Sequence, residues 1–244
     1  MRASGLLCIY VEIYINLKFN LLDFKEVKMS KVKVKICCIS SIKEAQIAIN
    51  HGASALGLVG EMPSGPGIIS DDLIAQISKT VPPPISTFLL TSETNADAII
   101  NHYKKVNTST IQIVDALNDR QYHKIRTELP HIKLVQVIHV IDNNSGKEAI
   151  EVSEFIDAIL LDSGNPNLST KELGGTGRTH NWDLSKEIRK SINVPLFLAG
   201  GINKDNVRQA IDFVEPFGID LCSSVRTNGQ LDEKKLEDFF KILE

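Results

Sequence analysis

From Met29 onward, short runs of β-branched and other apolar residues alternate with amphipathic segments. Residues 31–36 read KVKVKI, in which polar and apolar side chains alternate with the period of two expected for a strand. This pattern predicts strands at 32–37, 55–60, 86–91, 110–115, 133–140, 158–163, 195–200 and 218–223. It predicts helices at 41–51, 70–80, 95–105, 119–129, 146–155, 183–192, 203–213 and 232–243.

Eight successive strand–helix units are typical of a single (β/α)8 barrel, the TIM barrel, and a chain of 244 residues has a suitable length for one. A doubly wound open sheet is the structural alternative. Such a sheet usually has fewer units and carries glycines after its first strand, whereas this chain reads CISS at 38–41. We therefore expect one α/β domain, a (β/α)8 barrel, over residues 29–244.

Residues 1–28 differ from the rest of the chain. The apolar stretch at 6–22 is interrupted by Glu12, Asn16, Lys18 and Asn20, a pattern unsuited to a membrane span or a signal peptide. We expect an irregular N-terminal extension that is not part of the fold.

Charge and cysteine content narrow the possible partners. The formal net charge is −3 and lysines and arginines are scattered, which argues against nucleic acid and gives no membrane-binding surface. The four cysteines, at positions 8, 37, 38 and 222, lack the spacing of a metal site, so no metal is expected. These features indicate a cytoplasmic protein, either a monomer or a homodimer.

Two glycine-rich segments follow late strands. Residues 174–178 read GGTGR after the strand that ends at Asp162, and Gly200 and Gly201 follow the next strand. Glycines let several backbone N–H groups approach one anion, and barrels usually bind phosphate at the loops after strands seven and eight. The ligand is therefore expected to be a phosphorylated small molecule.

The period of two also selects side chains for the barrel interior. It places Lys35 and Cys37 inward on the first strand and Asp162 inward at the end of the sixth. A thiolate beside a lysine is a competent base, and a carboxyl group can protonate a sugar ring oxygen. The alternative is that Cys37 is a small buried apolar residue and Asp162 a loop cap. Asp220, inward on the eighth strand, is the expected partner of Lys35.

Several segments, in matching order, carry a family resemblance. They are Lys35-Ile36-Cys37, Leu161-Asp162-Ser163, GGTGR at 174–178 with Trp182, LAGGI at 198–202 with Asn206-Val207, and DLCSSV at 220–225. Together they resemble the phosphoribosylanthranilate isomerases of tryptophan biosynthesis over residues 31–244.

The resemblance implies an aldose–ketose isomerase without a cofactor. Its reaction is the Amadori rearrangement of N-(5-phosphoribosyl)anthranilate to 1-(2-carboxyphenylamino)-1-deoxyribulose 5-phosphate. By the same resemblance, Asp162 is the general acid at the ring oxygen and Cys37 the general base at C2. The substrate phosphate is expected at the backbone of Gly175, Thr176, Gly177, Gly200, Gly201, Ser223 and Ser224.

The chain departs from the family pattern at three positions, of which the first two concern the aglycone. Gly67 stands where the family has an arginine for the anthranilate carboxylate, and Arg178 and Arg226 are the candidate substitutes. Val114 replaces a histidine, for which His139 is the candidate replacement, the alternative being a purely structural His139.

Cys38, the third departure, replaces a glycine, and with Cys222 it is interpreted as structural. These changes leave open an alternative function, a phosphate-binding barrel that acts on or senses a different phosphorylated sugar.

Overall fold

The alternating strands and helices are present in the structure, a computed structural model that describes residues 31–175 and 177–244. The barrel strands are β1 (Lys33–Ile36), β2 (Ala55–Val59), β3 (Ser86–Thr91), β4 (Thr110–Ile113), β5 (Lys133–His139), β6 (Ala158–Asp162), β7 (Leu196–Leu198) and β8 (Gly218–Leu221). The helices are α2 (Ile42–Asn50), α3 (Asp71–Thr80), α4 (Ala96–Val106), α5 (Asp119–Glu128), α6 (Asn144–Val152), α7 (Trp182–Ser191), α8 (Val207–Val214) and α9 (Glu233–Leu243).

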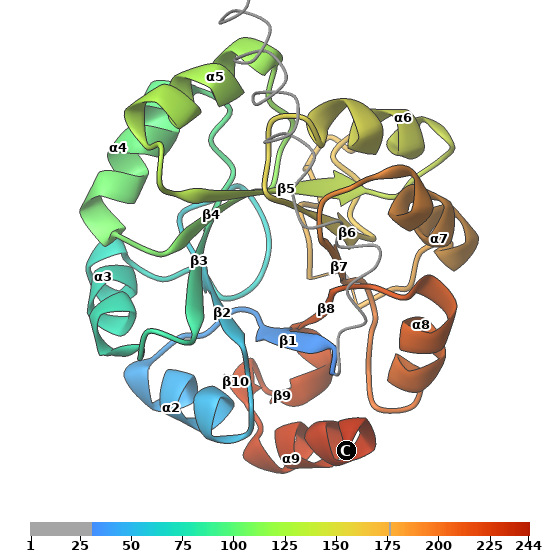
Figure 1. Cartoon of the computed structure of the whole chain (residues 1–244). Coiled ribbons are helices and arrows are strands. Elements are labelled where there is room, and N and C mark those ends of the chain that lie inside the picture. The colour runs from blue at the N-terminus through green and yellow to red at the C-terminus, as the bar shows by residue number, and fades with distance from the viewer. Residues whose placement is uncertain (1–30, 176) are drawn as a thin grey trace, which may run out of the picture. The chain divides into compact units, whose positions relative to one another are not determined.

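The strands form a closed parallel barrel in the order β1 to β8, with the helices around it (Figure 1). Closure is made by β1 and β8, which pair in register from Lys33 opposite Gly218 to Ile36 opposite Leu221. The predicted (β/α)8 barrel is confirmed.

Side chains alternate between two apolar layers along each strand. On β6, Ile159 and Leu161 pack in the layer between barrel and helices, whereas Ala158 and Leu160 belong to the smaller cluster in the barrel interior. Phe197 lies in that interior cluster at 6.0 Å from Phe88, measured between ring centroids. The interior is therefore filled by side chains, and an open site is left only toward the ends of the strands.

Five of the described helices begin with a side-chain cap, whereas α5, α6 and α8 have no side-chain cap hydrogen bond. The side chains of Ser70 and Asp232 accept hydrogen bonds from the first turns of α3 and α9. Helix α8 begins at Val207 rather than at the predicted 203, because Asn203 caps a separate turn by accepting from the N–H of Asp205.

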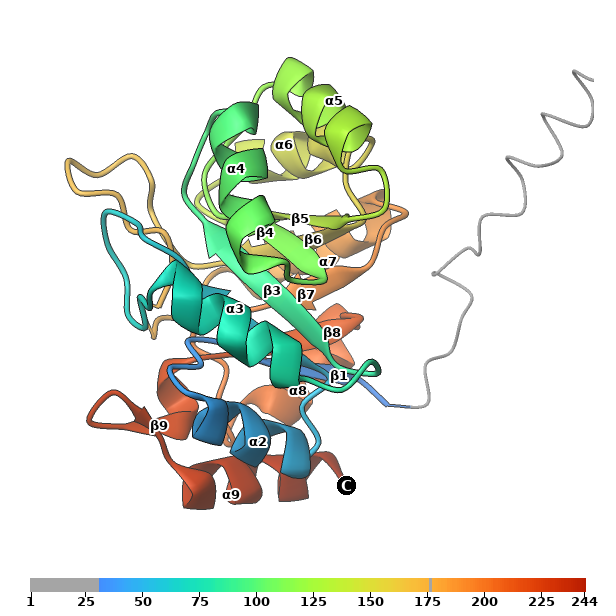
Figure 2. The ribbon, with the colours of Figure 1, turned by 90° about the vertical axis from the view of Figure 1, so that its left-hand side faces the viewer.

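An unpredicted segment separates β8 from α9. It consists of the 3-10 helix η1 (Ser223–Val225) and a hairpin of β9 (Arg226–Thr227) and β10 (Gln230–Leu231). In the side view the β2–α3 and β6–α7 connections project from one end of the barrel, at the left of Figure 2.

The expectation for residues 1–28 lies outside the described residues. Within residues 31–175 and 177–244, no helix has the length and apolar character needed to cross a membrane.

Candidate active site

A cavity lies among the segments that follow the barrel strands. Its volume is about 700 Å³, including space open to solvent. The predicted site residues that line it are Cys37, Asp162, Gly175, Gly177, Gly200, Gly201, Asp220, Ser223 and Ser224. Thr176 lies outside the described residues. The remaining predicted residues, Lys35, His139, Arg178 and Arg226, are not among the lining side chains.

Cys37 directly follows β1 and is 6% exposed. Its N–H donates to the carbonyl of Leu221 at 2.7 Å, which continues the β1–β8 pairing by one residue. Gly57 on β2 leaves room for its thiol, because a Cβ on that glycine would lie 2.8 Å from the Cys37 sulfur and 3.1 Å from Nζ of Lys35. The sulfur and the ammonium group therefore flank the same small space in the barrel interior.

The fully buried Lys35 is held by Asp220. Its ammonium donates to the Asp220 carboxylate at 2.9 Å, the pairing expected from the inward faces of β1 and β8. Burial lowers the pKa of Lys35, but the negative charge of Asp220 and the hydrogen bond to its carboxylate outweigh that effect and raise it. Lys35 is therefore a fixed cation beneath the cavity floor.

Asp162 ends β6 and is 8% exposed. Its Oδ1 accepts from the N–H of Ser163 at 2.8 Å, and its Oδ2 lies 2.9 Å from the place of a Cβ on Gly174. Burial lowers the pKa of nearby His180 to about 4, although the Asp162 charge opposes the shift. A neutral imidazole and a carboxyl group thus lie near each other on this side of the cavity.

The glycine turns converge. Gly175, Gly177, Gly200 and Gly201 all have positive φ, between 64° and 75°, which glycine adopts without strain. A Cβ on Gly201 would lie 2.7 Å from the main chain of Arg178 and Thr179, so the β6–α7 and β7–α8 connections are in contact.

The η1 segment lies against these turns. A Cβ on Gly177 would lie 3.5 Å from Oγ of Ser223. The hydroxyl of Ser224, also in the lining, is buried and has no hydrogen-bond partner among residues 31–175 and 177–244. Three backbone segments and the Ser224 hydroxyl therefore surround one end of the cavity, an arrangement suited to binding an anion.

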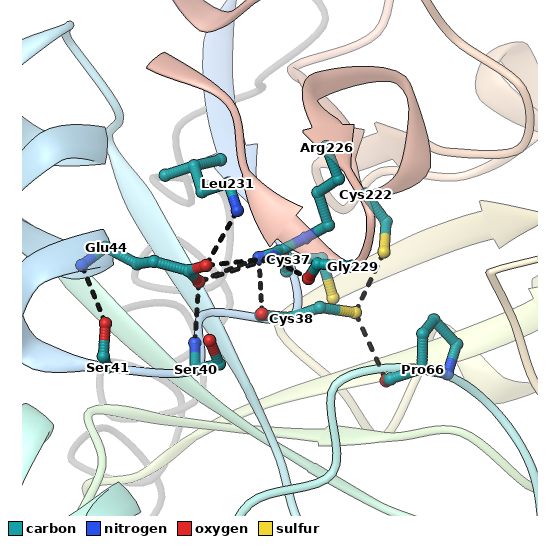
Figure 3. Close-up of polar contacts among 10 residues, drawn as sticks. All are labelled: Cys37, Cys38, Ser40, Ser41, Glu44, Pro66, Cys222, Arg226, Gly229 and Leu231. Atoms are coloured by element: carbon teal, nitrogen blue, oxygen red, sulfur yellow. Dashed lines mark hydrogen bonds and ion pairs between the residues drawn. The ribbon is translucent and has the colours of Figure 1, made fainter.

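The prediction that Arg226 replaces the missing carboxylate clamp is wrong. Arg226 is buried and forms an ion pair with Glu44 of α2 at 3.2 Å (Figure 3). Its guanidinium also donates to the carbonyls of Cys37 at 3.1 Å, of Cys38, and of Gly229 at 3.0 Å. Its charge is neutralised away from the cavity, and it fastens the turn that follows β1.

The two other predicted substrate-binding side chains, His139 and Arg178, also lie outside the cavity lining. His139 is buried outside the cavity and donates from Nε2 to the carbonyl of Val114 at 3.1 Å, which matches the structural alternative. Arg178 is exposed and paired with Glu172. Neither position carries a side chain that lines the cavity.

Gly67 and Cys38 occupy neighbouring space. Cys38 has a φ of 62°, which is unusual for a residue with a side chain, and its thiol donates to the carbonyl of Pro66 at 3.4 Å. A Cβ on Gly67, whose φ is 80°, would lie 2.5 Å from Cβ of Cys38. The cysteine that replaces the family glycine therefore fills the place where residue 67 would carry a side chain.

Sequence reasoning missed the contact between Cys38 and Cys222, whose sulfurs lie 2.9 Å apart. The available signal was topological, because β1 and β8 are neighbours in any closed eight-stranded barrel, and the two cysteines lie one or two residues beyond the ends of these strands. Sequence reasoning also missed Met62, Ser64 and Leu173, which line the cavity. They lie in the β2–α3 and β6–α7 connections, where no periodic pattern in the sequence predicts the conformation.

Fold and site define a (β/α)8 barrel whose open end carries a thiol, a carboxyl group and glycine turns around one cavity. Comparison with known proteins agrees with the resemblance. The family profile of N-(5'-phosphoribosyl)anthranilate (PRA) isomerase matches residues 34–242. The chain belongs to this family.

Two of the curated relatives named N-(5'-phosphoribosyl)anthranilate isomerase illustrate the similarity. The protein from Methanosarcina acetivorans is 32% identical over 224 residues, covering 86% of this chain and 92% of its own length. The protein from Methanocaldococcus jannaschii is also 32% identical, over 226 residues, covering 87% of this chain and 96% of its own.

Solved structures of the family have the same fold. The phosphoribosyl anthranilate isomerase of Thermotoga maritima superposes with a TM-score of 0.75 at 29% identity, over 87% of this chain and 98% of that one. A family structure in complex with reduced 1-(o-carboxyphenylamino)-1-deoxyribulose 5-phosphate has a TM-score of 0.72 at 27% identity with the same coverage.

Proposed function

We propose that the chain is an isomerase that converts N-(5-phosphoribosyl)anthranilate to 1-(2-carboxyphenylamino)-1-deoxyribulose 5-phosphate in tryptophan biosynthesis. The observation that carries the proposal is that Cys37 and Asp162, from strands far apart in the barrel, line the same cavity as the glycine turns. Family membership supplies the reaction, and the cavity supplies an acid, a base and an anion-binding end.

In the proposed mechanism, the protonated carboxyl group of Asp162 donates its proton to the furanose ring oxygen. The C1–O bond breaks, and the aglycone nitrogen supplies electrons to form the C1–N double bond of the Schiff base. The Cys37 thiolate then removes the proton from C2, and the resulting enolamine takes up a proton at C1 while the C2 hydroxyl becomes the ketone. Lys35 provides a positive charge beside the thiolate.

The phosphate is proposed to bind at the turns of Gly175, Gly177, Gly200 and Gly201 together with Ser223 and Ser224. Backbone N–H groups at these turns would bind the phosphate without a lysine or arginine, and the hydroxyl of Ser224, which has no hydrogen-bond partner among the described residues, would be an additional donor. Anchoring the phosphate at this end places the sugar between the thiol and the carboxyl group.

The test is turnover of phosphoribosylanthranilate by the purified chain, followed by loss of substrate fluorescence. Cys37→Ser and Asp162→Asn should each lower kcat by at least about 10²-fold, the usual contribution of a general acid or base. Asp97→Asn, at an exposed surface ion pair, is the matched control and should retain full activity. Wild-type-like turnover by both active-site variants would contradict the assignment.

A second candidate is favoured by the composition of the cavity. Among the described residues that line it there is no lysine, arginine or histidine, and residue 67 is glycine. A phosphoribosyl amine whose aglycone lacks a carboxylate would fit such a lining without an unpaired anion. A panel of phosphoribosyl amines with and without the ortho-carboxylate distinguishes the two candidates. A higher kcat/KM for the substrate without the carboxylate would favour the second candidate.

We further propose a cytoplasmic monomer or homodimer, in which residues 29–244 form the complete barrel. One family structure describes monomers generated from the dimeric Thermotoga maritima enzyme, so both states occur in a relative. Expression from Met29 tests the dispensability of the extension, and sedimentation tests the assembly state.

A further inference from the structure

Two thiols lie together at the rim of the cavity, and the proposed reaction uses neither. Cys38 follows Cys37 at the end of β1, and Cys222 follows β8, 184 residues later in the chain. Because Ile36 and Leu221 are paired partners at the ends of these adjacent strands, the residues just beyond them meet. Their sulfurs are 2.9 Å apart and joined by a hydrogen bond, as Figure 3 shows.

The pair is reachable by a small oxidant, because both residues line the cavity that opens to solvent. Cys38 is nearly buried, whereas Cys222 is partly exposed. In the reduced pair the Cys222 thiol donates to the Cys38 sulfur, while the Cys38 thiol donates to the Pro66 carbonyl. Hydrogen bonding between the two sulfurs and the guanidinium of Arg226 lower the pKa of Cys222, and burial opposes them. Once Cys222 has lost its proton, the more exposed of the two sulfurs is the thiolate, which favours it as the first nucleophile.

The backbone at Cys38 gives an independent argument. Its φ of 62° is a conformation that glycine adopts freely and that a residue with a Cβ adopts at a conformational cost. Strained residues persist mainly where the surrounding structure holds them and concentrate at functional sites. Here the strain directs the thiol toward Cys222 and the Pro66 carbonyl.

We propose that Cys38 and Cys222 form a redox-active dithiol, which hydrogen peroxide oxidises to an intramolecular disulfide at the cavity rim. The Cys222 thiolate attacks peroxide, so that an S–O bond forms, the O–O bond breaks and hydroxide leaves, which becomes water by taking up the proton that the Cys222 thiol released on ionisation. The Cys38 sulfur then attacks the sulfenic acid, so that the S–S bond forms, the S–O bond breaks and the second oxygen leaves as water with the Cys38 proton. The two thiols are oxidised and one peroxide is reduced to two waters.

The disulfide would alter the contact between β1 and the β2–α3 connection. Closing the sulfur separation from 2.9 Å to about 2.05 Å requires a small approach of two turns. The thiol hydrogen that Cys38 donates to Pro66 is lost in the reaction, so the connection at 61–69 loses this attachment. Oxidation of the two thiols is thus expected to loosen the 61–69 connection, which forms one wall of the cavity.

The experiment treats the reduced full chain with hydrogen peroxide and maps it by mass spectrometry after blocking free thiols and digesting with trypsin. The expected product links peptide 36–43 to peptide 209–226, with fragmentation assigning Cys38, and free thiols fall from four to two. Dithiothreitol restores all four. Cys38→Ser and Cys222→Ser should abolish the link, whereas Cys37→Ser should retain it.

Amide hydrogen exchange gives a second readout. Exchange within 61–69 should rise on oxidation of the wild type and stay unchanged in Cys222→Ser. A link through Cys37, or peroxide products confined to sulfenic or sulfinic acid without any cross-link, would overturn the proposal. Fragmentation of the cross-linked wild-type peptides identifies the linked cysteines even if a variant fails to fold. No readout depends on isomerase activity.

Discussion

The buried ion pair between Glu44 and Arg226 should be a principal stabiliser of the turn that follows β1. The substitution Glu44→Gln keeps the side-chain size and removes the charge. In the native chain the carboxylate accepts from the N–H groups of Ser40 at 2.9 Å and Leu231 at 2.8 Å as well as from Arg226. Burial raises the pKa of Glu44, but these hydrogen bonds and the guanidinium outweigh it and lower the pKa, so the group is ionised at neutral pH.

The magnitude follows from burial. At 3.2 Å two unit charges attract by about 5 kcal/mol with an effective dielectric constant of about 20, and desolvation of both groups offsets much of this. Removing only the carboxylate leaves a buried guanidinium without a counter-charge, since the exposed fractions of the Arg226 and Glu44 side chains are 6% and 9%. We expect Glu44→Gln to lower the free energy of unfolding by about 3–5 kcal/mol.

Urea unfolding of the full chain measures the effect, with the linear slope compared between variants. The matched control is Asp97→Asn, which breaks the Lys124–Asp97 pair, with side chains 47% and 64% exposed. That change should cost at most about 1 kcal/mol. If the free energy of unfolding of Glu44→Gln lies within about 1 kcal/mol of that of the control at equal slope, the conclusion that this ion pair stabilises the turn after β1 is refuted.

Three further outcomes are expected. Gly57→Ala should displace Cys37 and Lys35 and lower kcat, because the added methyl group overlaps both, whereas an unchanged kcat in steady-state kinetics would reject this packing. Gly201→Ala should raise KM for the phosphorylated substrate, since its Cβ would meet main-chain atoms at 2.7 Å, and an unchanged KM counts against the phosphate assignment. His180 has a pKa of about 4 in the folded state and about 6.5 unfolded, so the unfolded chain binds more protons between these values. Stability should therefore rise with pH from about 4 to 6.5, less steeply in His180→Asn, and an NMR titration midpoint near 6.5 would contradict it.

The barrel was predictable because strand alternation reports directly on burial. The same alternation correctly placed Lys35, Cys37 and Asp162 on the inward faces of their strands. A shift of one residue would have turned these polar side chains toward the helices and the apolar ones toward the barrel interior. It also anticipated the Lys35–Asp220 pair, because an inward lysine requires a counter-charge and few positions offer one.

The role of Arg226 was not predictable in this way. Its partner Glu44 lies 182 residues away on a helix, and the arginine follows the short 3-10 helix η1 and starts the hairpin before α9. A sequence shows that an arginine is present, but only the assembled structure shows that both of its terminal nitrogens already donate to Glu44 and to main-chain carbonyls. The same limit applies to Cys38 and Cys222, whose proximity depends on how two turns bend after their strands end.

The crowding between residues 38 and 67 makes the order of mutations matter. An arginine introduced at 67 alone would place its Cβ 2.5 Å from the Cβ and 3.0 Å from the sulfur of Cys38, and Cys38→Gly removes both contacts. The Cα of residue 38, at 3.0 Å, and the positive φ of residue 67 remain, so the main chain of the 61–69 connection must also shift. An evolutionary or laboratory route to a carboxylate-binding arginine at that position therefore has to change residue 38 first, and saturation mutagenesis of the 61–69 connection alone would leave the crowding in place.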